Sequence, residues 1–208
     1  MAAVMKNNPH ALIFKVRVNT MITAPAFDAT AWITQHTLGG TDLLPEATAA
    51  VANFTMMWNL FEGVLCGNHA NIREFERIAQ ELSGGQLSTE ETASLDECLA
   101  FWSFRYRTPE GFASRFDRLN FRPNDKRNLV EEVLSGTRHE LSDRALALMI
   151  IAYRLRNNLF HGLKTIKTLN NQVHNLNTAS RCLGALLAAS HAHLVRSKVF
   201  ELHRSGGA

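Results

Sequence analysis

Nine residues, Arg154 to Gly162, hold the densest set of reactive side chains in this 208-residue sequence. The stretch reads RLRNNLFHG and follows an apolar run, ALALMIIAY, at 145–153. It places two guanidiniums, two amides and one imidazole within eight positions. An imidazole moves protons near neutral pH, and a guanidinium binds the charge that grows on a phosphate during its transfer.

RNA cleavage without a metal is the reaction that this set fits best. The 2′-hydroxyl must lose a proton and the leaving 5′-oxygen must gain one, and His161 could serve as the acid or the base. Arg156 would stabilise the phosphorane transition state, and Asn157 would orient the ring or hold a phosphate oxygen. The products would be a 2′,3′-cyclic phosphate and a 5′-hydroxyl. Arg154 and Asn158 are the supporting residues of this predicted site.

The whole stretch is predicted to lie on one helix that begins near residue 142. At 100° per residue, one stripe of this helix is buried. The stripe comprises Leu148, Ala152, Leu155 and Leu159. Arg154, Asn157 and His161 share a second face, within about 60° of one another, so these polar groups need not enter the core. Arg156 lies about 140° from His161, and only its long side chain could bring the guanidinium near the ring.

The surrounding sequence is predicted to be helical as well. Pro45 stands at a plausible first helical position, and Ser88 to Glu91 form a capping box. There is no convincing series of alternating strands, so the expected fold class is an all-α bundle with short loops. The predicted helices run from Asp28 or Thr30 to 39–40, from Pro45 to about 67, and over 71–82, 88–106, 108–119, 123–134, 142–162 and 171–200. Residues 1–44 are treated as an N-terminal extension, with a short strand or an extended arm at 11–18, and residues 45–208 as the helical domain.

Composition limits the class of protein. Apolar residues make up 46% and charged residues 20%, as in ordinary globular domains. The three cysteines contain no CxxC pair, so neither a disulfide framework nor a metal site is indicated, and no cofactor is expected. No apolar run reaches the roughly 18 residues of a membrane span, and the N-terminus lacks the pattern of a secretory signal. We therefore expect a cytoplasmic protein without membrane association.

The net charge of +3 is divided unevenly along the chain. Residues 1–143 carry 13 Lys and Arg against 18 Asp and Glu, whereas residues 144–208 carry nine against one. A basic C-terminal third favours an anionic partner, with nucleic acid first. The alternative is a solvated basic face that acidic neighbours balance in the fold.

The segment RNNLFHG at 156–162 resembles the Arg-x(4–6)-His signature of HEPN domains, in which a polar residue typically follows the arginine. The resemblance implies a four-helix up-and-down core with extra short helices, over about 45–208. Many HEPN domains are metal-independent endoribonucleases, among them toxins of toxin–antitoxin pairs and abortive-infection proteins. It further implies an RNA substrate, a homodimer whose two motif helices form one composite site, and an antitoxin or another defence-system protein as partner.

Two further positions bear on this resemblance. An early helix with an aromatic–acid pair is frequent in the family, and MWNLFEG at 57–63 looks like that element. Its Glu62 would either be structural or, as a supporting residue, pair with an arginine or hold the histidine. In members that a partner nucleotidyltransferase silences, a tyrosine stands two positions after the histidine. Leu163 occupies that position here, which argues against this type of regulation but not against catalysis.

Two other interpretations of 156–162 stay open. The segment could bind phosphate without cleaving it, in a catalytically inactive HEPN-like module that binds RNA or protein. It could also be purely structural, with the arginine balancing the helix dipole and with asparagine and glycine ending the helix.

Overall fold

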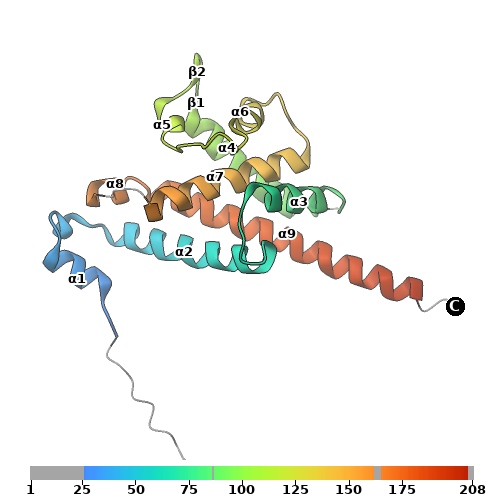
Figure 1. Cartoon of the computed structure of the whole chain (residues 1–208), viewed down its shortest axis with the longest axis horizontal. Coiled ribbons are helices and arrows are strands. Elements are labelled where there is room, and N and C mark those ends of the chain that lie inside the picture. Colours follow the sequence, from blue (N-terminus) through green and yellow to red (C-terminus); the bar gives the residue numbers. More distant parts are fainter. Residues whose placement is uncertain (1–25, 86, 162–164, 206–208) are drawn as a thin grey trace, which may run out of the picture.

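Helices make up almost all of the regular structure (Figure 1). The computed structural model describes residues 26–85, 87–161 and 165–205. Within these ranges the only strands are β1 (Arg107–Thr108) and β2 (Gly111–Phe112), which pair as an antiparallel hairpin. The expected all-α class is therefore confirmed. The helices are α1 (Ala29–His36), the 3-10 turn η1 (Gly40–Asp42), α2 (Pro45–Leu65), α3 (Ile72–Ser83), α4 (Thr89–Tyr106), α5 (Ser114–Asp117), α6 (Arg127–Ser135), α7 (Leu141–His161), α8 (Ile166–Asn170) and α9 (Val173–Ser205). No described helix is long and apolar enough to cross a lipid bilayer.

Several helices begin where the capping residues predict. Asp28 accepts a hydrogen bond of 2.9 Å from the backbone N–H of Ala31, so Asp28 rather than Thr30 caps α1. Pro45 is the first residue of α2. Ser88 and Glu91 make both hydrogen bonds of the capping box at the start of α4. These caps satisfy N–H groups that have no acceptor inside their own helix.

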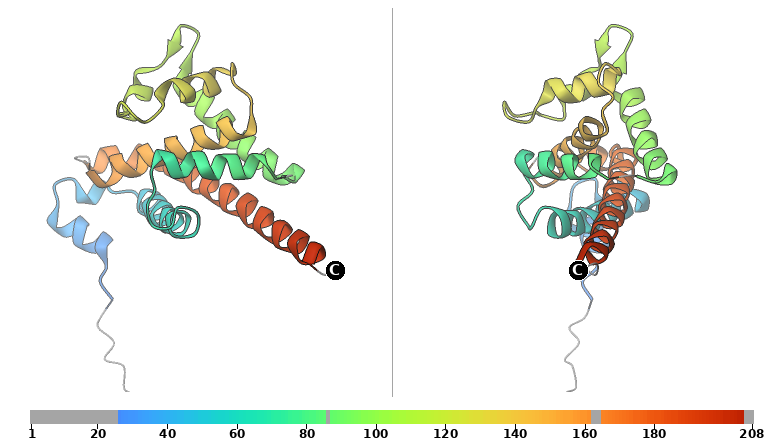
Figure 2. Two further views of the ribbon diagram at one scale, coloured as in Figure 1. Left: turned by 45° about the vertical axis from the view of Figure 1, so that its right-hand side comes forward. Right: turned by 90° about the vertical axis from the view of Figure 1, so that its right-hand side faces the viewer.

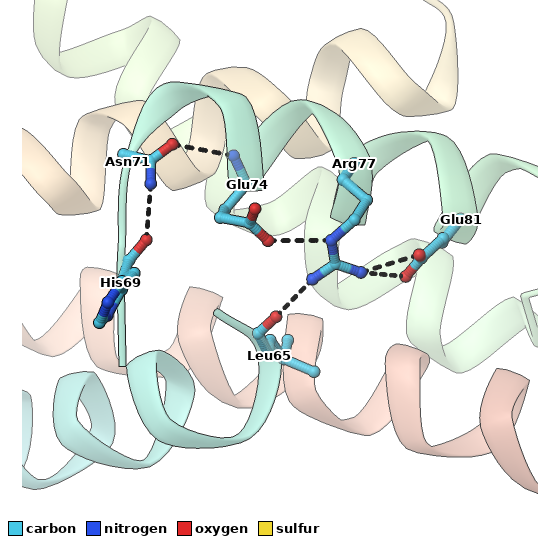
Figure 3. Close-up of polar contacts among 6 residues, drawn as sticks. All are labelled: Leu65, His69, Asn71, Glu74, Arg77 and Glu81. Carbon is cyan, nitrogen blue, oxygen red and sulfur yellow. Dashed lines mark hydrogen bonds and ion pairs between the residues drawn. The ribbon is translucent and has the colours of Figure 1, made fainter. Parts of the chain in front are cut away.

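The α2–α3 turn is held by one arginine (Figure 3). Arg77 Nη2 donates a hydrogen bond of 2.7 Å to the carbonyl of Leu65, the last residue of α2. The same guanidinium forms ion pairs with Glu74 at 2.9 Å and with Glu81 at 2.8 Å, on the next turns of α3. Asn71 caps α3 by accepting from the Glu74 N–H. The end of α2 is thereby joined to α3.

Two pairs of long helices that lie close together run in the same direction. α2 and α9 run in the same direction, because Met57 lies beside Gly184 and, further along both helices, Val64 lies near Ser190. α3 lies along α7, and α4 lies along α9 (Figure 1).

α4 and α7 also run in the same direction. Near their starts, Arg144 donates a hydrogen bond of 2.6 Å to Asp96, and near their ends Tyr106 and Leu155 line one cavity. The four-helix up-and-down core that the resemblance implies stays a prediction. Residues 107–140 carry the chain back along α4 before α7 begins, and they form a cap of hairpin, α5 and α6 on the side of α7 away from α2 (Figure 2).

α7 is the central helix of the fold. It contacts α3, α4, α6 and α9, and every residue from Ala145 to Ala152 is buried. The predicted stripe is also buried, with Leu159 partly exposed at its end. The middle of α7 is therefore buried on all sides and not along the single stripe that the sequence pattern predicted.

Two predicted helices are wrong in part. At 108–119, Thr108 belongs to β1, Pro109 and Glu110 form the turn of the hairpin, and only the short α5 follows. At 123–134 the helix begins four residues later than predicted, at Arg127, after Lys126 with a φ of 52°. Asp125 causes the delay, because its carboxylate accepts the Arg122 N–H at 2.7 Å and pairs with Arg154. Near these elements α7 begins at Leu141, slightly before the predicted cap, and the short α8 was not predicted.

The described part of the N-terminal extension touches the helical domain. Asn170 of α8 donates to the Asp42 carbonyl at 2.8 Å and accepts from the Leu44 N–H at 3.1 Å. Residues 1–25, which include the predicted strand or arm at 11–18, and Leu163 lie outside the described residues.

Candidate functional site

The last two turns of α7 carry the predicted site residues. Arg154 is buried, with 3% of its surface exposed. Its Nη1 pairs with Asp125 Oδ2 at 3.1 Å, and its Nε donates to the Leu119 carbonyl at 2.9 Å. Burial lowers the pKa of the Arg154 guanidinium, and the Asp125 charge opposes this effect. The prediction that Arg154 lies on an exposed face is wrong, because Arg154 is needed to hold residues 119–125 against α7.

Asn158 has a similar supporting position. Its Nδ2 donates to the carbonyls of Arg118 at 2.9 Å and Leu119 at 3.3 Å, and its Oδ1 accepts from Asn120 Nδ2 at 3.2 Å. Asn158 therefore satisfies carbonyls that follow α5 and have no partner inside that short helix.

Arg156 points away from Arg154, toward α2. Its Nη1 donates a hydrogen bond of 3.2 Å to Asn157 Oδ1, and its Cζ lies 6.0 Å from the Trp58 ring centre and 5.3 Å from the Phe160 ring centre. Arg156 forms no ion pair with a described carboxylate. The guanidinium is thus held by two aromatic rings and an amide, and its positive charge has no acidic counterpart there.

Asn157 is also buried, with 6% exposed, although the helix pattern predicted it on the exposed face. Its carbonyl accepts from Arg156, and its Nδ2 has no hydrogen-bond partner among the described residues. A buried amide donor without a partner costs free energy unless a ligand or water satisfies it. The Arg156 Nε is also buried and has no hydrogen-bond partner among the described residues.

His161 is the last residue of α7 and is exposed. It makes no hydrogen bond or ion pair with the described side chains of Arg154, Arg156 or Asn157. The structure therefore brings Arg156 and Asn157 into direct contact.

Glu62 reaches the site only through Trp58. Its Oε2 accepts from Trp58 Nε1 at 2.7 Å, and its Oε1 accepts from the Ala70 N–H at 3.3 Å. The Trp58 ring stacks on Tyr153 of α7 at 6.0 Å. Of the two interpretations of Glu62, these contacts match the structural one, because the carboxylate fixes the indole and the α2–α3 turn.

No protein-family model, curated protein or solved structure matches this chain. The resemblance to HEPN domains therefore rests on the motif at 156–162 and on MWNLFEG. Among the described residues, no three His, Cys, Asp or Glu side chains gather in a way that could hold a metal ion.

A cavity of about 170 Å³ adjoins the motif on another face of α7. Asn158 and Leu159 line it, together with three arginines that the motif-based reasoning missed: Arg105, Arg115 and Arg118. A signal for them exists, because residues 105–122 hold five arginines and only two acids. Summing charge over residues 1–143 concealed this short basic stretch.

Proposed function

We propose that this protein is an endoribonuclease of HEPN type that needs no metal and cleaves RNA by attack of the 2′-hydroxyl. One observation carries the proposal. The Arg156 guanidinium has no acidic partner among the described residues and is held by Asn157, Trp58 and Phe160, while His161 stands exposed five residues further along α7.

Arg156 would bind the phosphodiester. A planar guanidinium that already rests on two rings loses little rotational freedom when a phosphate arrives, and its remaining N–H groups match the phosphate oxygens. Asn157 holds the guanidinium in place, because its Oδ1 accepts from Arg156 Nη1. Donors that are fixed before the reaction stabilise the extra negative charge of the phosphorane.

His161 would move the protons. One imidazole can act as base toward the 2′-hydroxyl or as acid toward the leaving oxygen, and the reaction needs both roles. Because Arg156 and His161 point in different directions on α7, a second copy of the chain would complete the site. We therefore propose a homodimer in which the arginine of one protomer and the histidine of its partner meet at one phosphate.

The proposed biological setting comes from the resemblance to HEPN domains. An RNA-cleaving enzyme that acts inside a microbial cell would serve defence or a toxin system in the cytoplasm. Such an enzyme needs a neutralising protein, so an antitoxin or another defence protein is the proposed partner.

The test is incubation of the purified full chain with 5′-labelled RNA in EDTA. We expect fragments that end in a 2′,3′-cyclic phosphate and begin with a 5′-hydroxyl, and we expect His161→Ala to abolish them. His69→Ala is the matched control, because His69 is also exposed and its ring makes no described contact. Fragments that persist unchanged in His161→Ala would exclude His161 from the reaction.

A second candidate function rests on a different surface. Met56, Leu60 and Val64 follow one another at single-turn spacing on α2, and each is more than half exposed. An exposed apolar row is typical of a protein-binding helix. If the chain is a catalytically inactive HEPN-like module, RNA or a partner protein will bind it with equal affinity before and after His161→Ala, and no RNA fragments will form.

A further inference from the structure

Five elements meet around the cavity beside α7. α4 contributes Arg105 and Tyr106, residues 115–119 contribute Arg115 and Arg118, and α8 contributes Thr168. α7 closes one wall, and Asn175 of α9 closes another. The volume, about 170 Å³, is too small for a whole drug-sized ligand, which fills roughly 300 Å³ or more, but it accommodates a phosphate with part of a sugar.

The charge in this cavity is not balanced. Arg105, Arg115 and Arg118 form no ion pair with a described carboxylate, whereas Arg77, Arg127, Arg138, Arg144 and Arg154 all do. No acidic residue lines the cavity. Burial raises the pKa of Tyr106, despite nearby Arg105 and Arg115, so the hydroxyl stays neutral and does not compensate the arginines. A partly closed cavity with low-dielectric walls concentrates such a positive potential.

Two buried polar atoms at this cavity have no hydrogen-bond partner among the described residues. Arg105 Nε is an unused donor, and Asn175 Oδ1 is an unused acceptor on a side chain that is only 4% exposed. The Asn175 amide is fixed in this orientation, because its Nδ2 donates to Gln172 Oε1 at 2.7 Å. A ligand that satisfies both atoms must carry acceptors for the guanidiniums and a donor, such as a hydroxyl, for the asparagine.

We propose that this cavity binds the phosphate ester of a ribose, with the phosphate on the three arginines and a ribose hydroxyl on Asn175. The phosphate ester has two sources, a free nucleotide or an RNA strand. The inference does not depend on cleavage, since it uses none of the three proposed catalytic residues.

The experiment is isothermal titration calorimetry of the full chain with three probes: inorganic phosphate, adenosine 5′-monophosphate and an RNA 12-mer with free 2′-hydroxyls, which is titrated into His161→Ala so that the strand stays intact. We expect Arg115→Gln/Arg118→Gln to weaken binding by about tenfold or more, since each lost charge-assisted contact costs a factor of several. The matched control is Arg73→Gln/Arg107→Gln, which removes the same charge from two exposed arginines outside the cavity and should change binding less than about twofold. If the cavity pair of substitutions weakens the binding of adenosine monophosphate, a free nucleotide is a source of the ligand. If it weakens the binding of the 12-mer alone, the source is an RNA strand.

A second variant tests the asparagine. Asn175→Ala should weaken the binding of adenosine monophosphate by about fivefold and leave the binding of inorganic phosphate unchanged, because only the nucleotide carries the hydroxyl. The proposal is overturned if no probe binds, or if the control pair weakens binding as much as the cavity pair. If Asn175→Ala weakens the binding of adenosine monophosphate and of inorganic phosphate equally, Asn175 does not bind a ribose hydroxyl. Thermal unfolding of each variant verifies that the fold is retained.

Discussion

Trp58 Nε1 donates a hydrogen bond of 2.7 Å to Glu62 Oε2 across one turn of α2. The face of the same indole lies 6.0 Å from the Arg156 Cζ. The indole therefore contacts both a carboxylate and a guanidinium. Donation to a carboxylate makes the indole face more negative, which strengthens its attraction for the guanidinium. Glu62 stabilises Arg156 in this way without neutralising it.

The first prediction concerns this acid. Glu62→Ala leaves the Trp58 and Ala70 N–H groups without their acceptor. We expect the free energy of unfolding to fall by about 2 kcal/mol, measured by urea denaturation. Glu110→Ala, at an exposed position in the hairpin turn, should change it by less than about 0.5 kcal/mol. Equal losses in both variants would show that Glu62 does not hold the turn.

The buried ion pair between Arg154 and Asp125 gives the second prediction. Arg154→Met leaves a buried carboxylate without its counterion and should cost about 3–5 kcal/mol of unfolding free energy. Adding Asp125→Asn should restore more than about 1 kcal/mol, because the charge is removed while an oxygen remains for the Arg122 N–H. Urea denaturation of the single and double variants measures both. A double variant less stable than the single one contradicts this account.

The third prediction is an alkaline loss of stability. Burial, with smaller effects of Glu62 and Glu74, raises the pKa of the Cys66 thiol to about 12. In the unfolded chain the thiol has a pKa near 8.5. The resulting stabilisation is complete below the unfolded value and is lost as the pH rises toward 12, because the unfolded state releases its proton first.

Cys66→Ala isolates this effect, because the other thiols remain in both proteins. The difference in unfolding free energy between the unsubstituted protein and Cys66→Ala should shrink by up to about 1.4 kcal/mol for each pH unit above 9. Denaturation curves at pH 7.5, 9 and 10 give that difference. A difference that stays constant with pH would show that the folded thiol ionises as readily as the unfolded one.

Arg156→Lys separates charge from shape and gives the fourth prediction. Lysine keeps the positive charge but loses the planar donors that rest on Trp58 and Phe160. On the proposed mechanism, we expect RNA cleavage to fall by about 100-fold, with unfolding free energy changed by less than about 1 kcal/mol. Arg73→Lys serves as the control on an exposed helix position and should leave cleavage unchanged. Full cleavage by Arg156→Lys would refute a role for the guanidinium fork.

Capping residues and proline in the sequence correctly predicted where several helices begin. Asp28, Pro45, Asn71 and the Ser88 capping box each act within four residues of themselves, so the sequence alone carries the information. Pro109 shows the limit of such signals. Proline suits both the first turn of a helix and the second position of a β-turn, and the choice here depends on the pairing of Arg107 with Phe112.

The candidate site was only partly predictable for the same reason. Helical spacing could not show that Arg154 and Asn157 are buried. Arg154 is covered because Leu119 and Asp125, roughly 30 residues earlier, pack over it. The arginine-lined cavity was even harder to predict from local sequence, since α4, α5, α7 and α9 all contribute to it. Contacts between distant segments have no signature in the spacing of either segment.

The same distant contacts order the steps of folding. The carbonyls of Arg118 and Leu119 find their donors on Asn158 and Arg154, which the chain reaches 35 to 40 residues later. The segment that follows α5 therefore forms these bonds only after α7 has docked, since closing so long a loop must precede them. Substitutions in residues 107–126 should accelerate unfolding while leaving the refolding rate nearly unchanged.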